Sequence, residues 1–180
     1  HCFASIIHNC CKGVVGLKID LRQGLAQDHP TAVSGSVEIQ MPAEYQGQAP
    51  ATFEGCCLCT GEGAYTVTGT LRFTITGACA RCTKPASEQI TVPIEERFAR
   101  EISDLEEEEI FPIEGEFLEM DEALRQAALT ALPYRLLCRP DCKGLCPICG
   151  VDRNETDCSC EMNTENPFAI LRKLDLPEEV

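Results

Sequence analysis

The feature that most constrains this chain is a dense run of cysteines towards its C-terminal end. Six of the 14 cysteines in the 180-residue sequence lie between Cys138 and Cys160. Within that run the only sizeable apolar side chains are Leu145, Ile148 and Val151. These bury too little surface to offset the conformational entropy that is lost when such a segment becomes ordered. We therefore expect bound metal or disulfides to hold the segment together.

The spacing of the cysteines predicts a zinc site. Cys146-Pro-Ile-Cys149 followed by Gly150 is typical of a tight turn in which two thiolates approach one tetrahedral ion, and the glycine supplies backbone freedom after the second ligand. Cys158 and Cys160, the next pair along the chain, are the expected partners. A structural zinc contributes roughly 10 to 16 kcal/mol of apparent binding free energy near neutral pH, enough to order a segment this poor in core.

Cys138 and Cys142 are alternative zinc ligands, because six cysteines exceed the needs of one tetrahedral ion. Arg139 and Lys143 beside them favour thiolate ligation by lowering the pKa of the thiols. Disulfides are the competing interpretation, since the total number of cysteines is even. The first residues make a poor signal peptide, having no basic stretch and no small-residue cleavage site. We therefore expect a cytoplasmic protein whose reduced thiols are available to zinc.

Residues 1–16 show neither strand nor helix periodicity, and we interpret them as a translated leader or a disordered stretch. Lys12-Gly13-Val14 can be encoded as a bacterial ribosome-binding sequence, with Leu17 as a TTG start codon downstream. The gene sequence would test this hypothesis. Cysteines and histidines in this stretch are therefore assigned to no site.

Residues 17–100 are expected to form an antiparallel β domain, because apolar and polar residues alternate along several short segments. The expected strands are 17–21, 33–41, 53–60, 64–76 and 88–98, with a loop at 43–51. Gly69 suggests a bulge or bend, and Pro93 indicates an edge strand or a bulge. The predicted fold is α+β, mainly an antiparallel sheet or a partly open barrel.

Three further segments are expected after the β domain. Residues 101–120 read as an acidic linker followed by extended structure, since 10 of the 29 acidic residues lie between Asp104 and Glu122. A helix is predicted over 121–133, with an apolar stripe and a terminal proline. Residues 134–180 are expected to form a cysteine-rich zinc lobe that carries a short helix at 166–174.

A second CxxC motif lies at a predicted strand turn, away from the cysteine run. The residues of interest there are Cys79, Arg81, Cys82 and Lys84. Three interpretations remain open: a redox dithiol whose thiolates the two cations stabilise, a pair that completes a metal site with Cys138 and Cys142, or a turn with small buried side chains. Cys56, Cys57 and Cys59 lie in a predicted strand and read as small core or surface residues.

The net charge of −14 argues against a protein that simply coats nucleic acid, because an acidic surface is repelled by phosphates. Local basic groups could still contact RNA or an acidic face of a partner protein. The candidates are Arg72, Arg97, Arg139 and Lys143. An equally simple interpretation is that these charges only keep the surface solvated.

We expect no enzymatic activity and no small-molecule substrate. Apart from the histidines of residues 1–16, His29 is the single histidine, and it lies in a polar loop. The sequence has no Ser/His/Asp arrangement, phosphate-binding loop or HExxH motif. No apolar run approaches the length of a membrane span.

Several segments together resemble the large ribosomal RNA subunit accumulation proteins, the YceD-like family. The likeness covers residues 17–176 and is carried by Lys18-Ile-Asp-Leu, Thr70-Leu, Cys79-Ala-Arg-Cys82, Phe111-Pro-Ile-Glu-Gly, Leu132-Pro133, the run from Leu137 to Gly150, Asn154, Cys158-Ser-Cys160 and Asn166-Pro-Phe-Ala-Ile-Leu. The resemblance implies a non-enzymatic bacterial factor that supports accumulation of large-subunit ribosomal RNA. Some members lack the C-terminal cysteines, which implies that the zinc lobe stabilises the protein and that Cys79 and Cys82 lie nearer to the shared function.

The leading expectation is a ribosome-biogenesis factor that binds pre-ribosomal RNA or a ribosomal protein. The acidic chain favours a basic protein partner over bare RNA. A thiol-redox or metal-handling protein that uses Cys79 and Cys82 is the alternative. A zinc-ribbon adaptor in transcription is a third possibility.

Overall fold

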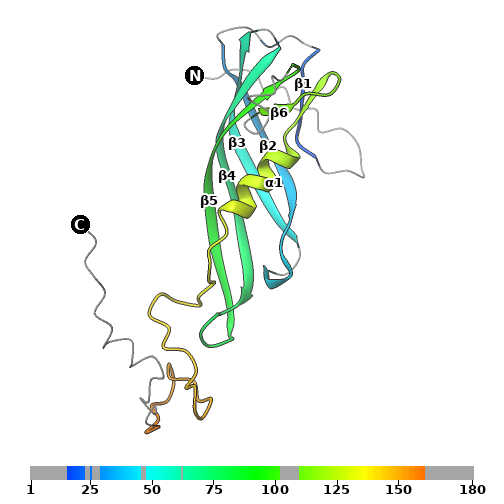
Figure 1. Cartoon of the computed structure of the whole chain (residues 1–180). Coiled ribbons are helices and arrows are strands. Elements are labelled where there is room, and N and C mark those ends of the chain that lie inside the picture. Colours follow the sequence, from blue (N-terminus) through cyan, green and yellow to red (C-terminus); the bar gives the residue numbers. More distant parts are fainter. Residues whose placement is uncertain are drawn as a thin grey trace, which may run out of the picture.

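A twisted five-stranded sheet forms the body of the protein (Figure 1). The structure is a computed structural model, and it describes residues 16–22, 25, 29–45, 48–61, 63–101 and 110–160. The order across the sheet is β2-β3-β4-β5-β6. The bounds are β2 Thr31–Gln40, β3 Gln48–Gly61, β4 Ala64–Ala78, β5 Pro85–Ala99 and β6 Ile110–Pro112. β1 Lys18–Asp20 pairs with β7 Phe117–Glu119 in a separate two-stranded sheet.

The predicted alternation of side chains holds along the two longest strands. Val67, Leu71, Phe73 and Ile75 of β4 are buried on one face, while the threonines between them point the other way. β4 and β5 pair in antiparallel register along their whole length, from Ala64 opposite Ala99 to Ala78 opposite Pro85. The turn that joins them is therefore carried to one far end of the sheet.

The sheet is mixed rather than wholly antiparallel, because β6 pairs with β5 in parallel over three residues. Within the described residues the sheet is open, with β2 at one edge and β6 at the other, so of the two predicted arrangements, a sheet or a partly open barrel, the sheet is observed. Among the described strands, β5 has no second neighbour at Pro93, since β6 reaches only Arg97–Ala99, and this agrees with the expected edge position.

The prediction of a loop over residues 43–51 is wrong. Residues 43–45 form a short 3-10 helix, and β3 already begins at Gln48, because Ala49 and Ala51 continue the buried alternation that leads to Phe53. The segment mixes alanine, glutamine, glycine and proline, and its propensity alone favours a loop. Pairing with β2 overrides that preference.

Gly69 marks a close approach of backbones and not a register shift. The pairing of β3 with β4 runs through Gly69 opposite Gly55 without interruption, and the shift occurs instead between Cys59 and Gly61. A Cβ on Gly69 would lie 2.7 Å from both the Gly55 Cα and the Phe53 ring. The two glycines therefore leave room for the Phe53 ring, which is fully buried.

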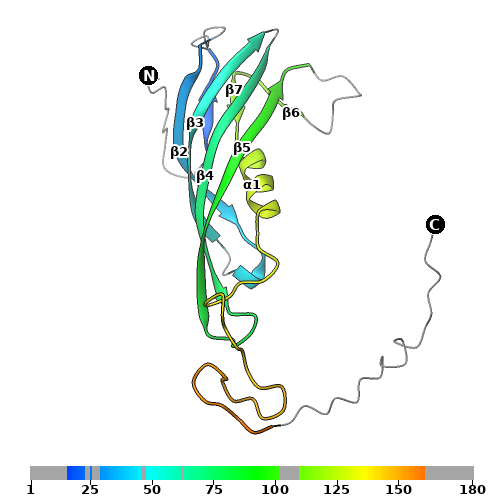
Figure 2. The same cartoon turned by 90° about the vertical axis from the view of Figure 1, so that its left-hand side faces the viewer.

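Helix α1, Asp121–Thr130, covers the inner face of the sheet and packs against β5 and β2 (Figures 1 and 2). Ala123, Leu124 and Ala128 are its buried residues. The helix ends at the Ala131 cap, slightly earlier than the predicted stop, because the residue that precedes Pro133 is disfavoured in helical conformation.

The segment that follows α1 runs down to the far end of the sheet. Figure 2 shows residues 134–160, drawn from yellow to orange, beside the turn between β4 and β5. Among these residues the one regular pairing is an isolated bridge between Leu145 and Asp152. The predicted leader apart from Gly16, the acidic residues of 104–109 and the predicted helix at 166–174 lie outside the described residues.

Candidate metal centre

Eight cysteines at this end of the molecule gather into two groups of four. We call the first the sheet-end cluster; it consists of Cys79, Cys82, Cys138 and Cys142. We call the second the loop cluster; it consists of Cys146, Cys149, Cys158 and Cys160. Within each cluster all four sulfurs lie within 4.8 Å of one another. Four convergent thiols are the donor set of a structural zinc site.

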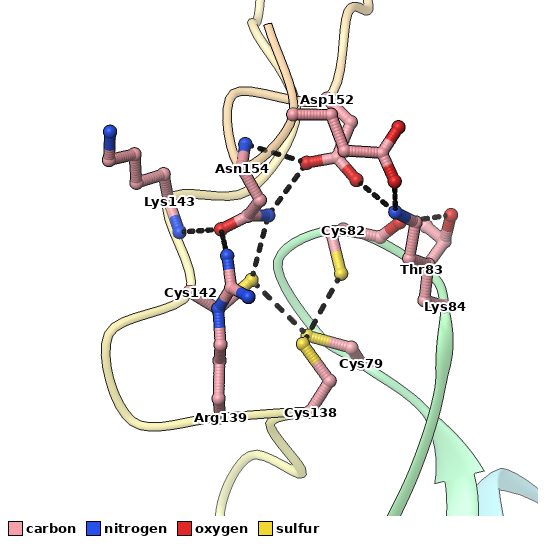
Figure 3. A network of polar contacts seen from close by, with 11 residues as sticks. Cys79, Cys82, Thr83, Lys84, Cys138, Arg139, Cys142, Lys143, Asp152 and Asn154 are labelled. Carbon is pink, nitrogen blue, oxygen red and sulfur yellow. Dashed lines mark hydrogen bonds and ion pairs between the residues drawn. The ribbon is translucent and has the colours of Figure 1, made fainter.

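The sheet-end cluster joins two distant parts of the chain. Cys79 and Cys82 lie at the turn between β4 and β5, whereas Cys138 and Cys142 follow α1 (Figure 3). The Cys79 and Cys142 sulfurs are 3.8 Å apart, and the Cys82 and Cys138 sulfurs are 3.6 Å apart. A tetrahedral zinc with Zn–S bonds of about 2.3 Å places its sulfurs about 3.8 Å from one another. These distances therefore fit one zinc ion.

The loop cluster is local in sequence and more open to solvent. Its four cysteines all come from residues 146–160, and Cys149 is exposed while Cys158 and Cys160 are half-buried. In the sheet-end cluster, by contrast, Cys79, Cys82 and Cys142 are each at most 2% exposed, and Cys138 is the one exposed member. The two sites thus differ both in how far apart their residues lie along the chain and in their access to water.

Both clusters contain the same backbone turn, although the sequences of the two turns differ. In each, the amide of the first cysteine donates a hydrogen bond of 2.8 Å across the turn, and the carbonyl of that cysteine accepts one of 2.9 Å. The bonds are Cys79 N to Lys84 O, Cys146 N to Val151 O, Thr83 N to Cys79 O and Gly150 N to Cys146 O. The turn at Cys79 therefore has the same zinc-knuckle geometry as the turn predicted at Cys146.

The residue after the second cysteine of each turn has a left-handed backbone. Gly150 has φ of 73° and Thr83 has φ of 62°. Glycine adopts this conformation without strain, whereas a β-branched residue does so only when its surroundings impose it. The threonine hydroxyl donates to the Cys82 carbonyl at 2.7 Å, which is a local compensation. Because the residue after Cys82 is a threonine and not a glycine, the sequence alone did not indicate a zinc knuckle at this turn.

Asn154 supports the sheet-end cluster from outside the ligand set (Figure 3). Its side-chain Nδ2 donates to the Cys142 sulfur at 3.4 Å. Its Oδ1 accepts from the Lys143 amide and from the Arg139 guanidinium, each at 2.8 Å. One side chain therefore fixes the loop on both sides of a ligand. The sequence provided no signal for this role beyond the presence of Asn154 in the family resemblance.

Arg81 and Lys84 tie the turn between β4 and β5 to the cysteine-rich segment. The Arg81 guanidinium donates to the Cys142 carbonyl at 2.7 Å, and the Arg81 carbonyl accepts from the Leu145 amide at 3.0 Å. Lys84 forms an ion pair of 2.7 Å with Asp152 and a second ion pair with Glu155. Lys84 holds the pKa of Asp152 at about 2, below the ordinary range of a carboxyl group. The side chains of Arg81 and Lys84 are therefore both paired with groups of the cysteine-rich segment.

The thiol pKa values within each cluster are spread widely. Burial of Cys79 is outweighed by backbone hydrogen bonds, from Cys138 first, which lower its pKa to about 6, while burial raises the pKa of Cys138 to about 12. In the loop cluster the Cys149 amide lowers the pKa of Cys146 to about 6, and a hydrogen bond with Cys149 raises that of Cys160 to about 12. Neighbouring thiols resist ionising together because like charges repel, and a divalent cation removes that restriction.

The structure brings together Cys146, Cys149, Cys158 and Cys160, the group favoured from spacing. Cys138 and Cys142 do not compete for that position, because they face Cys79 and Cys82 instead. This is one of the three interpretations left open for the second CxxC motif. The cysteines of β3 join neither cluster: Cys57 is fully buried in the core, with a pKa raised to about 12 by burial, and Cys56 and Cys59 are half-buried.

The four basic residues proposed as partner contacts do not form one surface. Arg72 lies on the exposed face of β4 and pairs with Glu54 at 2.9 Å, and Arg97 lies on the exposed face of β5. Arg139 and Lys143 belong to the segment around the sheet-end cluster, where both contact Asn154. The Arg139 contact is made by its guanidinium, whereas the Lys143 contact is made by its backbone amide.

The sequence matches the model of one protein family over residues 67–175, more than half of the chain. That family is described as "Large ribosomal RNA subunit accumulation protein YceD". Similar stretches occur in uncharacterised proteins of Mycobacterium tuberculosis and Mycobacterium bovis, which are 41% identical over 46 residues. The match covers 26% of this chain and 22% of the length of those relatives. No solved structure matches significantly.

Proposed function

The chain belongs to the YceD family of large ribosomal RNA subunit accumulation proteins, and from that premise we propose that it is a cytoplasmic, non-enzymatic ribosome-biogenesis factor. It acts by binding pre-ribosomal RNA or a ribosomal protein, and it supports accumulation of large-subunit ribosomal RNA. The family match carries this proposal, since it spans most of β4, β5, α1 and both cysteine clusters. No helix in the described part of the chain is long and apolar enough to cross a membrane.

Zinc bound by the two clusters has a structural role in this proposal. Cys79, Cys82, Cys138 and Cys142 hold one ion, and Cys146, Cys149, Cys158 and Cys160 hold another. Each ion supplies a tetrahedral cross-link between thiolates and no open coordination position for chemistry. The first cross-link fastens the cysteine-rich segment to the end of the sheet, so that β-sheet and segment present one rigid surface to a partner.

Charge favours a ribosomal protein over bare RNA as the direct partner. The chain has 29 acidic and 15 basic residues, and four thiolates around a divalent ion add negative charge at each cluster. Lys84, Arg81 and Arg139, which lie in the segments that carry the sheet-end cluster, are engaged with groups of the protein itself. Ribosomal proteins carry the complementary basic surface, and electrostatic steering speeds association with them.

The thiol-redox alternative needs Cys79 and Cys82 as an isolated dithiol. Two observations favour metal binding over that chemistry: each of these sulfurs lies within 4 Å of a third or fourth cysteine, and the turn has the hydrogen bonds of a zinc knuckle. Replacing both residues with serine separates the hypotheses. A redox protein would keep its ribosomal association and lose dithiol reactivity, whereas a structural cluster would lose bound metal and the docking of the segment.

The decisive experiment is affinity purification of the tagged full chain from cells at moderate salt, with and without ribonuclease, followed by identification of RNA and proteins. We expect components of the large ribosomal subunit that persist after ribonuclease treatment. Loss of every ribosomal protein on ribonuclease treatment would show that the chain contacts RNA directly and ribosomal proteins only through RNA. A preparation without ribosomal components, together with unchanged ribosomal RNA after depletion of the protein, would refute the proposed function. Transcription complexes in its place would support the adaptor hypothesis.

A further inference from the structure

The loop between two cysteines of the loop cluster carries a side chain that contacts the sheet-end cluster. Residues 150–157 lie between Cys149 and Cys158, two cysteines of the loop cluster, so their course depends on how that cluster closes. Yet the side chain of Asn154 contacts Cys142 of the sheet-end cluster (Figure 3). The two sites are therefore joined through a specific side chain and not only through the chain between Cys142 and Cys146.

The orientation of Asn154 is fixed within this loop. Its backbone amide donates to Asp152 Oδ1 at 2.9 Å, and its side-chain Nδ2 donates to the same oxygen at 2.6 Å. Asp152 lies in turn opposite Leu145 in a short antiparallel bridge, and the backbone bond from Cys146 N to Val151 O at 2.8 Å flanks that pair. A second backbone bond, from Arg153 N to Gly144 O at 3.0 Å, holds the loop against the segment that precedes Cys146. These contacts hold the Asn154 amide group at the Cys142 sulfur.

Asn154 acts on the sheet-end cluster in two ways. Its N–H group donates to the Cys142 sulfur at 3.4 Å and so orients that ligand within the cluster. Its carbonyl oxygen accepts from the Lys143 amide and the Arg139 guanidinium, and so sets the backbone on both sides of Cys142. Groups that hydrogen-bond to a metal ligand in this way typically change metal affinity by about 10 to 100-fold when they are removed.

We propose that the two clusters bind metal cooperatively and that Asn154 is the positioning residue that couples them. Metal at the loop cluster orders residues 150–157, places the Asn154 side chain on Cys142, and thereby raises the affinity of the sheet-end cluster. Coupling between two binding equilibria is reciprocal, so metal at the sheet-end cluster raises the affinity of the loop cluster by the same factor. This inference goes beyond the proposed function, because it concerns metal loading and does not depend on any ribosomal partner.

The test compares three full-length chains with Co²⁺ as the probe, followed by its thiolate charge-transfer absorption in competition with a chelator. The wild type binds two ions, Cys149→Ser with Cys158→Ser leaves the sheet-end cluster, and Cys79→Ser with Cys138→Ser leaves the loop cluster. We expect the overall constant for two ions in the wild type to exceed the product of the two single-site constants by about 10 to 100-fold. This ratio needs no assignment of which site fills first.

The same ratio is then measured in chains that carry Asn154→Ala, and we expect it to fall to about one. Asn154→Asp keeps an oxygen acceptor for Lys143 and Arg139 but removes the N–H donor, so it distinguishes the bond to sulfur from the support of the backbone. Asp157→Asn, an exposed substitution in the same loop, is the matched control and should leave the ratio unchanged. A general loss of folding would lower both single-site constants, whereas loss of coupling changes only their relation to the overall constant.

Three results would overturn the inference. A ratio of about one in the wild type means that the clusters load independently. A high ratio that survives Asn154→Ala means that the coupling runs through the backbone and not through this side chain. Failure of either cluster to bind Co²⁺ or Zn²⁺ removes the basis of the inference altogether, while the ribosomal purification experiment would still stand as the separate test of function.

Discussion

The two cysteine clusters use the same turn for opposite structural purposes. The sheet-end cluster joins residues that are 56 and 63 positions apart in the sequence and is largely buried. The loop cluster closes a short segment on itself and is partly open to solvent. The comparison teaches that the zinc-knuckle turn specifies how two thiols are presented, while the origin of the other two thiols decides whether the metal builds tertiary structure or only local structure.

The largest effect should come from removing metal altogether. A strong chelator should release the ions and unfold residues 134–160, because structural zinc contributes roughly 10 to 16 kcal/mol of apparent binding free energy to segments of this kind. The sheet should persist, since Phe53, Leu71 and Leu124 form a core that contains no metal. Amide hydrogen exchange with and without chelator measures both regions in one experiment. Equal protection of residues 134–160 in both samples would mean that the segment folds without metal.

Next in size is an effect confined to the sheet. Phe53→Ala should destabilise the protein by about 3 to 5 kcal/mol, because Phe53 is fully buried and its ring fills the space above Gly55 and Gly69. If the loop cluster is a local unit, its stoichiometry and affinity for Co²⁺ should not change in this variant. Urea denaturation and metal titration of the same preparation check the two statements. A parallel loss of loop-cluster affinity would show that this cluster depends on the sheet.

The two turns differ at the residue after the second cysteine, which is Gly150 in one and Thr83 in the other. Substitutions at these two positions should measure the cost of the left-handed backbone conformation. Gly150→Ala should weaken the loop cluster by about 1 to 2 kcal/mol, since a Cβ is disfavoured at φ of 73°. Thr83→Gly should have the opposite sign and a smaller size, because relief of the left-handed conformation is partly offset by the entropy of glycine. Competition of each variant with a chelator measures the change. Destabilisation by Thr83→Gly would show that its bond to the Cys82 carbonyl outweighs the strain.

The smallest effect concerns the ion pair that bridges the two regions. Asp152→Asn should cause a small, salt-dependent loss of stability at neutral pH, because it removes one of the two carboxylate partners of Lys84. Lys84 lowers the pKa of Asp152 to about 2, so the contribution of the pair is complete above the ordinary carboxyl pKa of about 3.9 and is lost as the pH falls towards 2. Denaturation of metal-loaded wild type and variant at low and high salt measures it. Equal differences at both salt concentrations would assign the effect to the Asn154 contacts of Asp152 instead.

The strands and the helix were largely visible in the sequence because they depend on local periodicity. Val67, Leu71, Phe73 and Ile75 alternate with threonines, and a one-residue slip would move all of them to solvent. The beginning of β3 at Gln48 was not visible, because its alanines are stabilised by pairing with β2 and not by their own propensity. The pairing of β6 with β5 was also not predicted. β6 has only three residues, and so short a segment has no sequence pattern that indicates which strand it pairs with or whether the pairing is parallel.

The loop cluster could be predicted from spacing, since its cysteines lie within a short segment whose possible conformations are few. The sheet-end cluster could only be named as one of several possibilities. Its two halves meet because the β4–β5 hairpin carries Cys79 and Cys82 to the end of the sheet, and because α1 packs across the inner face and directs Cys138 and Cys142 to the same end. Neighbouring residues dictate a turn, whereas a contact across 56 or 63 positions is set by how whole elements pack, and no spacing in the sequence encodes that packing.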